Sequence, residues 1–429
     1  MLDKEIREEI IDLIHREVVP AIGCTEPVAV ALCVAKAKEL LGTTPASLDL
    51  RLSGNIIKNA MGVGIPGTGM IGLPIAVALG ALVGKSEYGL EVLRDVTPDA
   101  VAEGKEYIAE GRINISLCED APSNLHIDVK AVGEDGLESR AVISGSHTGF
   151  VYLSKGKEVL LDNTGCSEAD ASHGEDDVAL NLKMVYDFAT ESPLDELRFI
   201  LEAKRLNKAA AELALNNDYG HCLGATIRHS GLRWFGDSPL DHMMSYTSAA
   251  CDARMGGAQI AVMSNSGSGN QGICATMPVV SFAEDMNASE EQLIRALILS
   301  HLTSIYIKQS LGRLSALCGC VVASTGASSG ITFLMGGKYK EICAAVKNMI
   351  ANLTGMICDG AKPSCSMKIT SGVSTALMSA MLAMEGRYVT AAEGIISDDV
   401  DESIKNLTSI GREAMQETDR LVLSIMTGK

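Results

Sequence analysis

The sequence predicts an α+β protein, in which a mainly helical core carries a small antiparallel β-sheet subdomain. Apolar residues recur with helical periodicity over most of the second half of the chain, whereas short alternating runs are confined to residues 112–162. Glycines number 42, and aromatic residues make up only 4% of the 429 residues. Because small side chains let helices approach closely, this composition favours a compact helical interior with much buried backbone.

The first part of the chain alternates between helical, strand and loop patterns. Residues 3–19 have the periodicity of an amphipathic helix and end before a proline. The segment GCTEP interrupts, and residues 28–41 resume as a second helix. Residues 47–53 alternate apolar and polar side chains and predict a strand, and a further helix is predicted over 74–82.

The β-rich region consists of five short runs separated by turn-forming residues. These runs are INISLCE, LHIDVKAV, SRAVISG, GFVYLS and KEVLLD, parted by PSN, GEDG, SGSHTG and SKGK. Such spacing predicts a small antiparallel sheet. Residues 163–178 are acidic and rich in Ser, Asp and Gly, so we expect a surface connection there.

Helices are predicted for nearly all of the chain beyond residue 178. They cover residues 195–216, 243–255, 290–311, 338–353, 374–385 and 401–415. We therefore expect three parts: an N-terminal helical and loop region over 1–110 that contributes to the active site, a β-rich subdomain over 111–165, and a helical domain over 166–429.

Charge and hydropathy exclude several classes of protein. The formal net charge is −18, so we expect no nucleic-acid partner, since no basic surface stands out that could bind phosphates. The charged N-terminus lacks the apolar core of a signal peptide. Three uncharged stretches, 60–84, 255–283 and 314–337, are too rich in Gly, Pro, Ser or Asn to span a bilayer. They are typical of buried interior around a site, and we expect a cytoplasmic protein without a membrane partner.

Four cysteines gather in the C-terminal third, in nearly uncharged segments rich in Gly and Ser. They are Cys318 and Cys320 in ALCGCVVASTGASSG, and Cys358 and Cys365 in MICDGAKPSCSMK. Thiolates placed in this way inside a cell favour a soft metal or an iron–sulfur cluster over disulfides. The spacing matches neither a zinc ribbon nor the common ferredoxin run, so the motif alone leaves the metal open. Any single cysteine here is also compatible with a small buried core residue.

Two further segments have the composition of anion-binding loops. NSGSGNQGI (265–273) precedes an apolar run, and SGNIIKN (53–59) ends a strand and places Lys58 close to several amide donors. Free backbone N–H groups with Ser or Asn side chains bind carboxylates and phosphates well. Neither segment matches a P-loop, so a small anionic substrate is the broader expectation.

Cys24 lies in the Pro-bounded segment PAIGCTEP (20–27), between two predicted helices. Its expected position near the N-terminus of the second helix would lower the pKa of the thiol and present a thiolate. A buried helix-breaking turn is the alternative interpretation.

Together these segments resemble a known family. PAIGCTEPVAVAL, SGNIIKN, SGSGNQGI, LSALCGCVVASTGASSGI and MICDGAKPSCSMK are similar to segments of the L-cysteine desulfidase family of prokaryotes, which is related to the α chain of iron–sulfur L-serine dehydratases. The resemblance runs nearly end to end. It implies a helical core like that of the serine dehydratase α chain, and a [4Fe–4S] cluster held by three cysteines, with one iron open for substrate. Carried onto this chain, the ligands are Cys318, Cys358 and Cys365, with Cys320 as an alternative to Cys318. The cluster would then lie in the helical domain of residues 166–429.

The chemistry implied by the resemblance is α,β-elimination of hydrogen sulfide from L-cysteine, giving pyruvate and ammonia. The open iron would act as a Lewis acid on the leaving group. Cys24 is the candidate base, and Lys58 is expected to bind the substrate carboxylate or to act as the base itself. The substrate contacts are expected from five polar side chains, those of Ser53, Asn55, Ser266, Ser268 and Asn270. A homodimer is possible.

Three other functions remain open at the level of sequence. An L-serine dehydratase would use the same cluster. A pyridoxal-phosphate β-lyase would use Lys58 as the Schiff base and the SGSGN segment for the phosphate, and would leave the clustered thiols without a purpose. A thiol-rich metal-storage protein would leave the anion-binding loops without a purpose.

Overall fold

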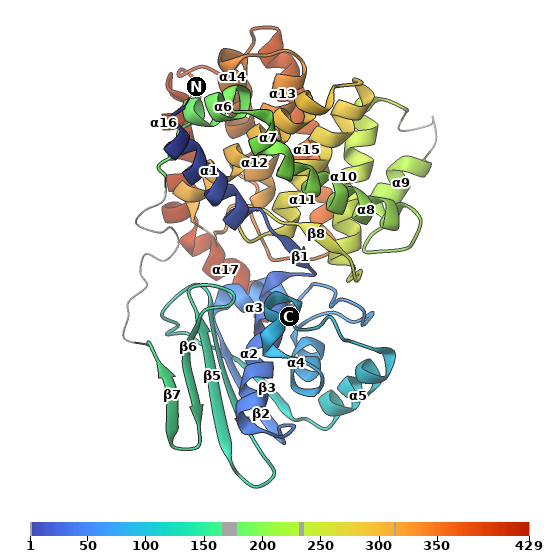
Figure 1. The fold of residues 1–429 in the computed structure, drawn as a ribbon, viewed down its shortest axis with the longest axis vertical. Helices are drawn as coiled ribbons and strands as arrows, with labels where there is room; N and C mark the ends of the chain where they lie inside the picture. The colour runs from blue at the N-terminus through green and yellow to red at the C-terminus, as the bar shows by residue number, and fades with distance from the viewer. Residues whose placement is uncertain (1, 165–177, 231–235, 313–314, 429) are drawn as a thin grey trace.

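The computed structural model describes residues 2–164, 178–230, 236–312 and 315–428. Figure 1 shows two halves stacked along the longest axis, one mainly helical and one that contains the large sheet. The expected acidic connection over 163–178 falls almost wholly outside the described residues. The α+β class with a helical core is confirmed.

The helical half is built from the first helix and from nearly all of the chain beyond residue 181. Its helices are α1 (Lys4–Glu17), α6 (Leu182–Glu191), α7 (Leu194–Leu197), α8 (Leu201–Leu215), α9 (Leu223–His229), α10 (Pro239–Met255), α11 (Gly269–Asp285), α12 (Glu290–Leu311), α13 (Gly319–Leu334), α14 (Tyr339–Leu353), α15 (Cys365–Met384) and α16 (Val400–Ser409), with the 3-10 helix η2 (Arg198–Ile200) and the π-helix η4 (Ile410–Ala414).

The other half combines a six-stranded sheet with helices on one of its faces. Its helices are α2 (Thr25–Leu41), α3 (Gly54–Ala60), α4 (Leu73–Leu82), α5 (Pro98–Ala109) and the 3-10 helix η1 (Ser86–Glu91). Its strands are β2 (Ser47–Leu52), β3 (Ile113–Leu117), β4 (His126–Val132), β5 (Glu138–Ser144), β6 (Phe150–Lys155) and β7 (Glu158–Asp162).

The sheet has the strand order β3-β2-β4-β5-β6-β7. Every neighbouring pair is antiparallel except β2 and β3, which are parallel. All five predicted β runs are strands, and the sheet gains β2 from the N-terminal part of the chain. The division predicted from sequence places β2 and β3 in different segments, whereas in the fold they are neighbours in one sheet, because the parallel connection returns through α3, α4 and α5.

Helix α2 is the centre of the sheet-containing half. It packs on β4 and β5 on one side and on α4 on the other, and so is apolar around most of its circumference. Leu32, Leu50 and Ile127 belong to the same core, which is separate from that of the helical half. The helix ends at Gly42, whose φ of 90° is a left-handed cap.

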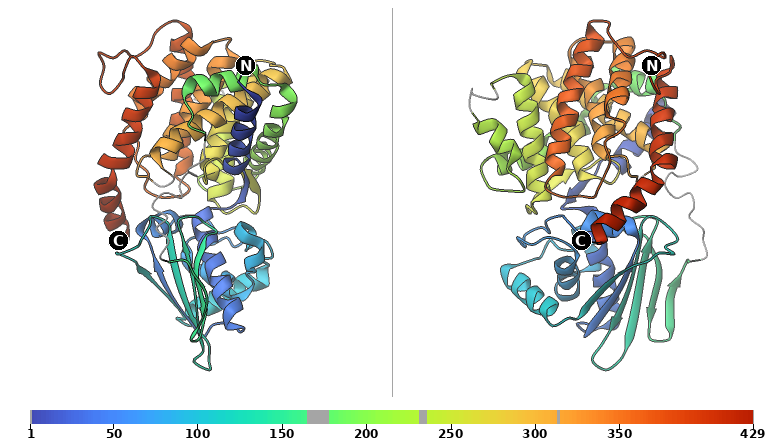
Figure 2. Two further views of the ribbon diagram at one scale, coloured as in Figure 1. Left: turned by 60° about the vertical axis from the view of Figure 1, so that its left-hand side comes forward. Right: turned by 180° about the vertical axis from the view of Figure 1, so that it is seen from behind.

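Two short elements and the C-terminal helix join the halves. β1 (Pro20–Ile22) pairs antiparallel with β8 (Ala261–Met263), which ties the chain before α2 to the chain before α11. Helix α17 (Gln416–Thr427) runs from the helical half down to α3, as Figure 2 shows. The segments GCTEP, NSGSGNQGI and SGNIIKN lie where these elements meet.

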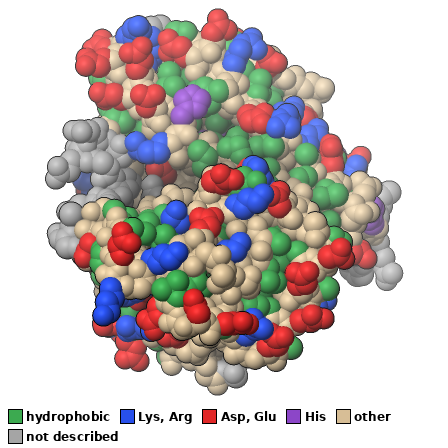
Figure 3. All heavy atoms as spheres, turned by 60° about the horizontal axis from the view of Figure 1, so that its bottom comes forward, with side chains coloured by type: hydrophobic (Ala, Val, Ile, Leu, Met, Phe, Trp, Pro, Cys, Tyr) green, Lys and Arg blue, Asp and Glu red, His purple; other side chains and the backbone are tan. Residues whose placement is uncertain are grey.

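Two surface features bear on partners. In the view of Figure 3, Lys and Arg side chains are interspersed with Asp and Glu over the face of the sheet-containing half. Among the helices in the described ranges, none combines enough length with enough apolar character to cross a membrane.

Candidate functional site

The thiols of the C-terminal third converge through backbone hydrogen bonds. The amide of Cys318 donates to Met356 O at 3.0 Å, and the amide of Cys358 donates to Ala316 O at 2.6 Å. Cys318 is the N-cap of α13, and Cys365 is the first residue of α15, which packs on α13. Two segments distant in sequence therefore bring three thiols to one place.

The pKa values of these thiols are raised because the thiols are buried and lie close together. Burial raises the pKa of the Cys318 thiol well above its ordinary value, and the negative charges of Cys320, Cys358 and Cys365 raise it further. Burial raises the pKa of Cys365 as well. Lys368 lies beside them, donating to Ile357 O at 2.8 Å and forming an ion pair with Asp359. A nearby cation offsets part of the charge that a set of thiolates would carry.

Cys320 is oriented differently from the other three. Its Sγ donates to Lys368 O at 3.1 Å, and it is hydrogen-bonded to Cys274 of α11. A Cβ at Gly372 would lie only 2.6 Å from this sulfur, so Cys320 fills the contact between α13 and α15. Its environment is that of a packed core thiol.

The donor chemistry of Cys318, Cys358 and Cys365 suits a soft metal centre, since three thiols share one region with two lysines nearby. Within the described residues, however, no three or more His, Cys, Asp or Glu side chains are placed as a ready set of metal ligands. The three thiols nevertheless have the donor type that such a group needs, and they lie near one another.

The sequence predicted an anion-binding loop for SGNIIKN, but in the structure this segment is the N-cap and most of helix α3. Lys58 lies on this helix with its side chain 2% exposed, and its ammonium group forms an ion pair with Asp419 of α17. The carbonyl of Lys58 lies against Gly360, between Cys358 and Cys365. The loop between Cys358 and Cys365 thus packs on the backbone of Lys58, while the ammonium group of Lys58 is paired with Asp419.

The two polar residues at the start of this helix differ in their partners. The hydroxyl of Ser53 donates to Asn124 O at 2.8 Å and accepts from the amide of His126 at 3.1 Å. Ser53 therefore ties α3 to the sheet. By contrast, Asn55 Oδ1 is a buried oxygen without a hydrogen-bond partner among the described residues.

GCTEP forms the N-terminus of α2, with Cys24 as the N-cap. Cys24 Sγ donates to Glu26 Oε2 at 2.9 Å, and the thiol is 2% exposed. Burial raises the pKa of Cys24 well above its ordinary value, the charge of Glu26 raises it further, and Arg254 opposes this. The pKa shift expected from the helix N-terminus has the wrong sign, because desolvation and a like-charged neighbour outweigh the helix dipole.

The NSGSGNQGI segment lies directly against GCTEP. Thr25 Oγ1 donates to Gly267 O at 3.2 Å, and the amide of Ser264 donates to Val19 O. This contact and the β1–β8 pair hold the two segments together. Both segments carry residues predicted to act on the substrate, and the fold makes the two segments neighbours.

The three polar side chains predicted in this segment have local partners. Ser266 Oγ donates to Asn265 Oδ1 at 2.9 Å, from a residue with φ of 47°. Ser268 is the N-cap of α11 and accepts from the amide of Gln271 at 3.3 Å. Asn270 Oδ1 accepts from Cys251 Sγ at 3.6 Å. These bonds shape the turn into α11.

Four further residues enter the site that were not singled out from the sequence: Glu26, Gln271, Lys368 and Asp419. Glu26, Gln271 and Lys368 stand inside segments already noted, so the motif itself was the available indication. Asp419 is distant in sequence in an amphipathic helix, and nothing local marks it.

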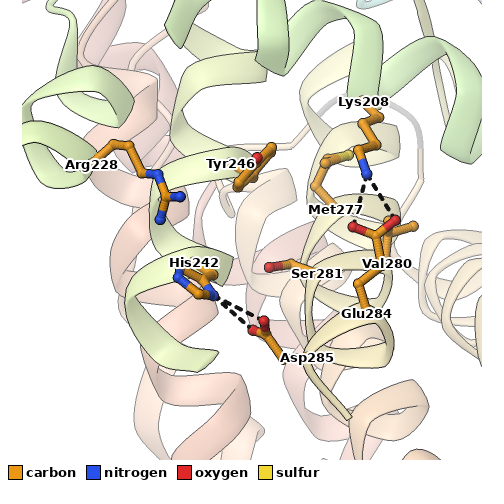
Figure 4. A pocket seen from close by; sticks show the side chains of 9 residues that line it. All are labelled: Lys208, Arg228, His242, Tyr246, Met277, Val280, Ser281, Glu284 and Asp285. Carbon is orange, nitrogen blue, oxygen red and sulfur yellow. Dashed lines mark hydrogen bonds and ion pairs between the residues drawn. The ribbon is translucent and has the colours of Figure 1, made fainter. Parts of the chain in front are cut away.

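A separate charged pocket of about 180 Å³ opens among α8, α9, α10 and α11 (Figure 4). Its lining residues are Lys208, Arg228, His242, Tyr246, Met277, Val280, Ser281, Glu284 and Asp285. His242 lies between two carboxylates, at 2.9 Å from Asp285 and 2.6 Å from Asp237. None of the residues predicted from the sequence lines this pocket.

The fold and site define a helical protein with a thiol-lined region where GCTEP, SGNIIKN and the Gly- and Ser-rich turn meet. Residues 87–424 match the family model for the serine dehydratase alpha chain, and the chain belongs to that family. Its relatives include a UPF0597 protein of Bacteroides fragilis, 65% identical over 99% of this chain and 98% of that protein. A UPF0597 protein of Porphyromonas gingivalis is 54% identical over the full length of both. Another, from Oleidesulfovibrio alaskensis, is 47% identical over 98% of this chain and 97% of that protein.

Proposed function

We propose that the protein is an iron–sulfur-dependent lyase that eliminates hydrogen sulfide from L-cysteine. The observation that carries the proposal is the convergence of three thiols, with Gly360 between two of them packed against the backbone of Lys58 in α3. Membership of the serine dehydratase alpha-chain family supports it. Net, L-cysteine and water give pyruvate, ammonia and hydrogen sulfide. The Cα–H and Cβ–S bonds break and a Cα–Cβ double bond forms, and the resulting aminoacrylate tautomerises and is hydrolysed. No electron is gained or lost.

Cys318, Cys358 and Cys365 would hold the [4Fe–4S] cluster. When bound through three thiolates, such a cluster supplies a Lewis-acidic iron for the leaving group. The packing of Cys320 between α13 and α15 supports Cys318 as the third ligand. Lys362 and Lys368, both paired with Asp359, would keep positive charge near the thiolates.

The base that we propose is Cys24, activated by Glu26. With its pKa raised by burial, Cys24 is a neutral thiol, and a neutral thiol does not remove a proton from carbon. Its proton has an acceptor in Glu26 Oε2 at 2.9 Å. Transfer of that proton to Glu26 leaves a thiolate, which then takes the Cα proton of the substrate. Glu26 thus accepts the thiol proton and allows Cys24 to act as the base.

Lys58 would bind the substrate carboxylate. Its ammonium group has three N–H donors, and the ion pair with Asp419 Oδ1 uses one of them. Asn55, one turn earlier on α3, would add a polar contact from the same helix. Ser266, Ser268 and Asn270 then act mainly by shaping the turn that carries the opposite wall.

L-Serine is the second candidate substrate, and the family match is the observation that favours it. The same base, carboxylate contact and Lewis acid would expel water instead of hydrogen sulfide. Sequence and fold support the elimination equally for both leaving groups, so the two substrates are to be compared directly.

The test is anaerobic reconstitution followed by assays with both amino acids. The proposal expects about four iron and four sulfide per chain, with pyruvate released from L-cysteine together with an equal amount of sulfide. If pyruvate is released from L-serine but not from L-cysteine, the substrate is serine. A preparation that contains no iron, and that keeps its activity and colour in air but loses both with a carbonyl reagent, would instead indicate pyridoxal phosphate on Lys58. Iron binding without turnover of either amino acid would point to metal storage.

Matched variants test the proposed base. Glu26→Gln keeps the size of the side chain but removes the proton acceptor, and Cys24→Ala removes the base. Each is expected to retain iron and to lose at least about a hundredfold in kcat, the usual contribution of a general base. Cys343→Ala, a half-buried thiol of α14, is the control and is expected to leave both iron and kcat unchanged. Loss of iron from Cys24→Ala would make Cys24 a ligand and refute its role as base.

A further inference from the structure

Gln271 carries a buried oxygen whose partner is missing. The residue is 1% exposed, and within the described residues its Oε1 has no hydrogen-bond partner. Leaving a buried acceptor unpaired costs about 1–3 kcal/mol, so such atoms are uncommon unless a ligand or water completes them. Gln271 lies in the first turn of α11, four residues after Gly267, which accepts from Thr25 of GCTEP.

The surrounding hydrogen bonds determine that the unpaired atom is the oxygen. Burial lowers the pKa of His301 to about 3, so the imidazole is neutral and has one donor and one acceptor nitrogen. The hydroxyl of Thr276 donates its proton to Gly272 O at 2.7 Å, so His301 Nε2 must donate to Thr276 Oγ1, at 2.9 Å.

The same logic continues along the network to Gln271. Since Nε2 of His301 is the donor, its Nδ1 accepts from Asn265 Nδ2, at 3.1 Å. Asn265 Oδ1 then faces Gln271 and accepts from Gln271 Nε2 at 2.8 Å. Both amides are therefore fixed in orientation, and Gln271 Oε1 is left as an acceptor. A neutral His301 keeps this arrangement unchanged across the physiological range of pH.

The free oxygen points at the segment that carries the thiols. A Cβ built on Gly319 would lie 3.2 Å from Gln271 Oε1, so the missing side chain of Gly319 leaves space beside this atom. Gly319 stands between Cys318 and Cys320. The acceptor thus lies beside Gly319, the direct neighbour of the proposed ligand Cys318.

We propose that Gln271 Oε1 accepts a hydrogen bond from the α-ammonium group of the amino-acid substrate. This inference rests on the proposed function. At neutral pH a β-substituted amino acid has donors only on its ammonium and β groups, and the β group is the one that leaves. The carboxylate, which is an acceptor, would be repelled by Oε1 and belongs with Lys58. Gln271 is then the residue that distinguishes an amino acid from a simple thiol acid.

The experiment compares two ligands that differ only in the amino group, L-cysteine and 3-mercaptopropionate. Binding is measured anaerobically by titration calorimetry on reconstituted protein carrying Cys24→Ala, which blocks turnover. Adding Gln271→Leu is expected to weaken binding of L-cysteine by roughly 10- to 100-fold, as for loss of a charge-assisted hydrogen bond. Binding of 3-mercaptopropionate is expected to change by less than about threefold, since it makes no such bond.

A second variant and a control keep the result interpretable. Gln271→Asn retains the amide but withdraws the oxygen, and should give a smaller loss for L-cysteine alone. Gln259→Leu, an exposed glutamine that donates to Arg94 O, should change neither affinity. Equal weakening of both ligands, or none, would overturn the ammonium contact. Failure of the proposed function is distinguishable, because protein with native Cys24 would then release no pyruvate whatever Gln271 binds.

Discussion

Gly360 and Lys58 meet backbone to backbone: a Cβ at Gly360 would lie 2.1 Å from the carbonyl oxygen of Lys58. Gly360 also has φ of 89°, a conformation that other residues rarely adopt. The glycine of the CDGAK segment therefore has two independent reasons to lack a side chain. Through this contact the loop between Cys358 and Cys365 is placed against α3.

Gly360→Ala is expected to destabilise the protein and to impair metal loading. The backbone conformation alone costs about 1–3 kcal/mol, and the collision with Lys58 adds to it. Thermal unfolding and the iron content after reconstitution measure the two effects. Gly355→Ala, an exposed position just upstream with open space around its Cβ, is the control. If both variants behave alike, the close approach is not important for the site.

Exchanging Asp419 for Ala should destabilise the contact between α17 and α3. The change leaves the ammonium group of Lys58, which is 2% exposed, without its carboxylate, at a cost of about 1–3 kcal/mol. Urea denaturation measures the change in the free energy of unfolding. Glu417→Ala removes an exposed acidic residue of the same helix and should have almost no effect. In Lys58→Met, further removal of Asp419 should cost little, as in a double-mutant cycle.

Alanine variants of Cys318 and Cys320 distinguish which of the two is the third ligand of the proposed cluster. Cys318→Ala is expected to lose most of its iron, because it removes a ligand. Cys320→Ala is expected to keep its iron and to lose only about 1 kcal/mol of stability from packing between α13 and α15. Iron analysis and thermal unfolding of both variants decide between them. The reverse pattern would move the ligand to Cys320.

His242 should make stability depend on pH. Burial alone would lower the pKa of His242, but hydrogen bonds to Asp237 and Asp285 outweigh it and raise the pKa. The stabilisation of the folded protein by protonated His242 is therefore complete below the ordinary histidine pKa of about 6.5. It is lost as the pH rises through the higher pKa that His242 has in the folded protein.

Chemical denaturation over this interval measures the effect of His242. The chain with His242→Gln should lack this decline, while an exposed control, His229→Gln, should retain it. Parallel curves for all three proteins would show that the two carboxylates do not bind the protonated imidazole.

Helices with recurring large apolar residues were predictable, whereas a helix made mostly of small residues was not. The periodicity of 290–311 coincides with α12, and the five β runs are all strands. Helix α13 was not predicted, because its Gly, Ser and Thr residues show no contrast between faces. In the fold it is buried nearly throughout between α12 and α15, and its hydroxyls bond to carbonyls one turn back, as Thr325 does to Val321 O at 2.8 Å.

By itself the sequence determined the fold class and the family, and it indicated the segments that we propose to form the site, because these depend on residue type and local order. Tertiary structure decided which atoms meet. It raised the pKa of Cys24 where a local argument lowered it, paired Lys58 with Asp419, turned Cys320 into the core, and left Gln271 Oε1 unpaired among the described residues. Each outcome depends on burial and on neighbours far away in the chain, and local sequence contains neither.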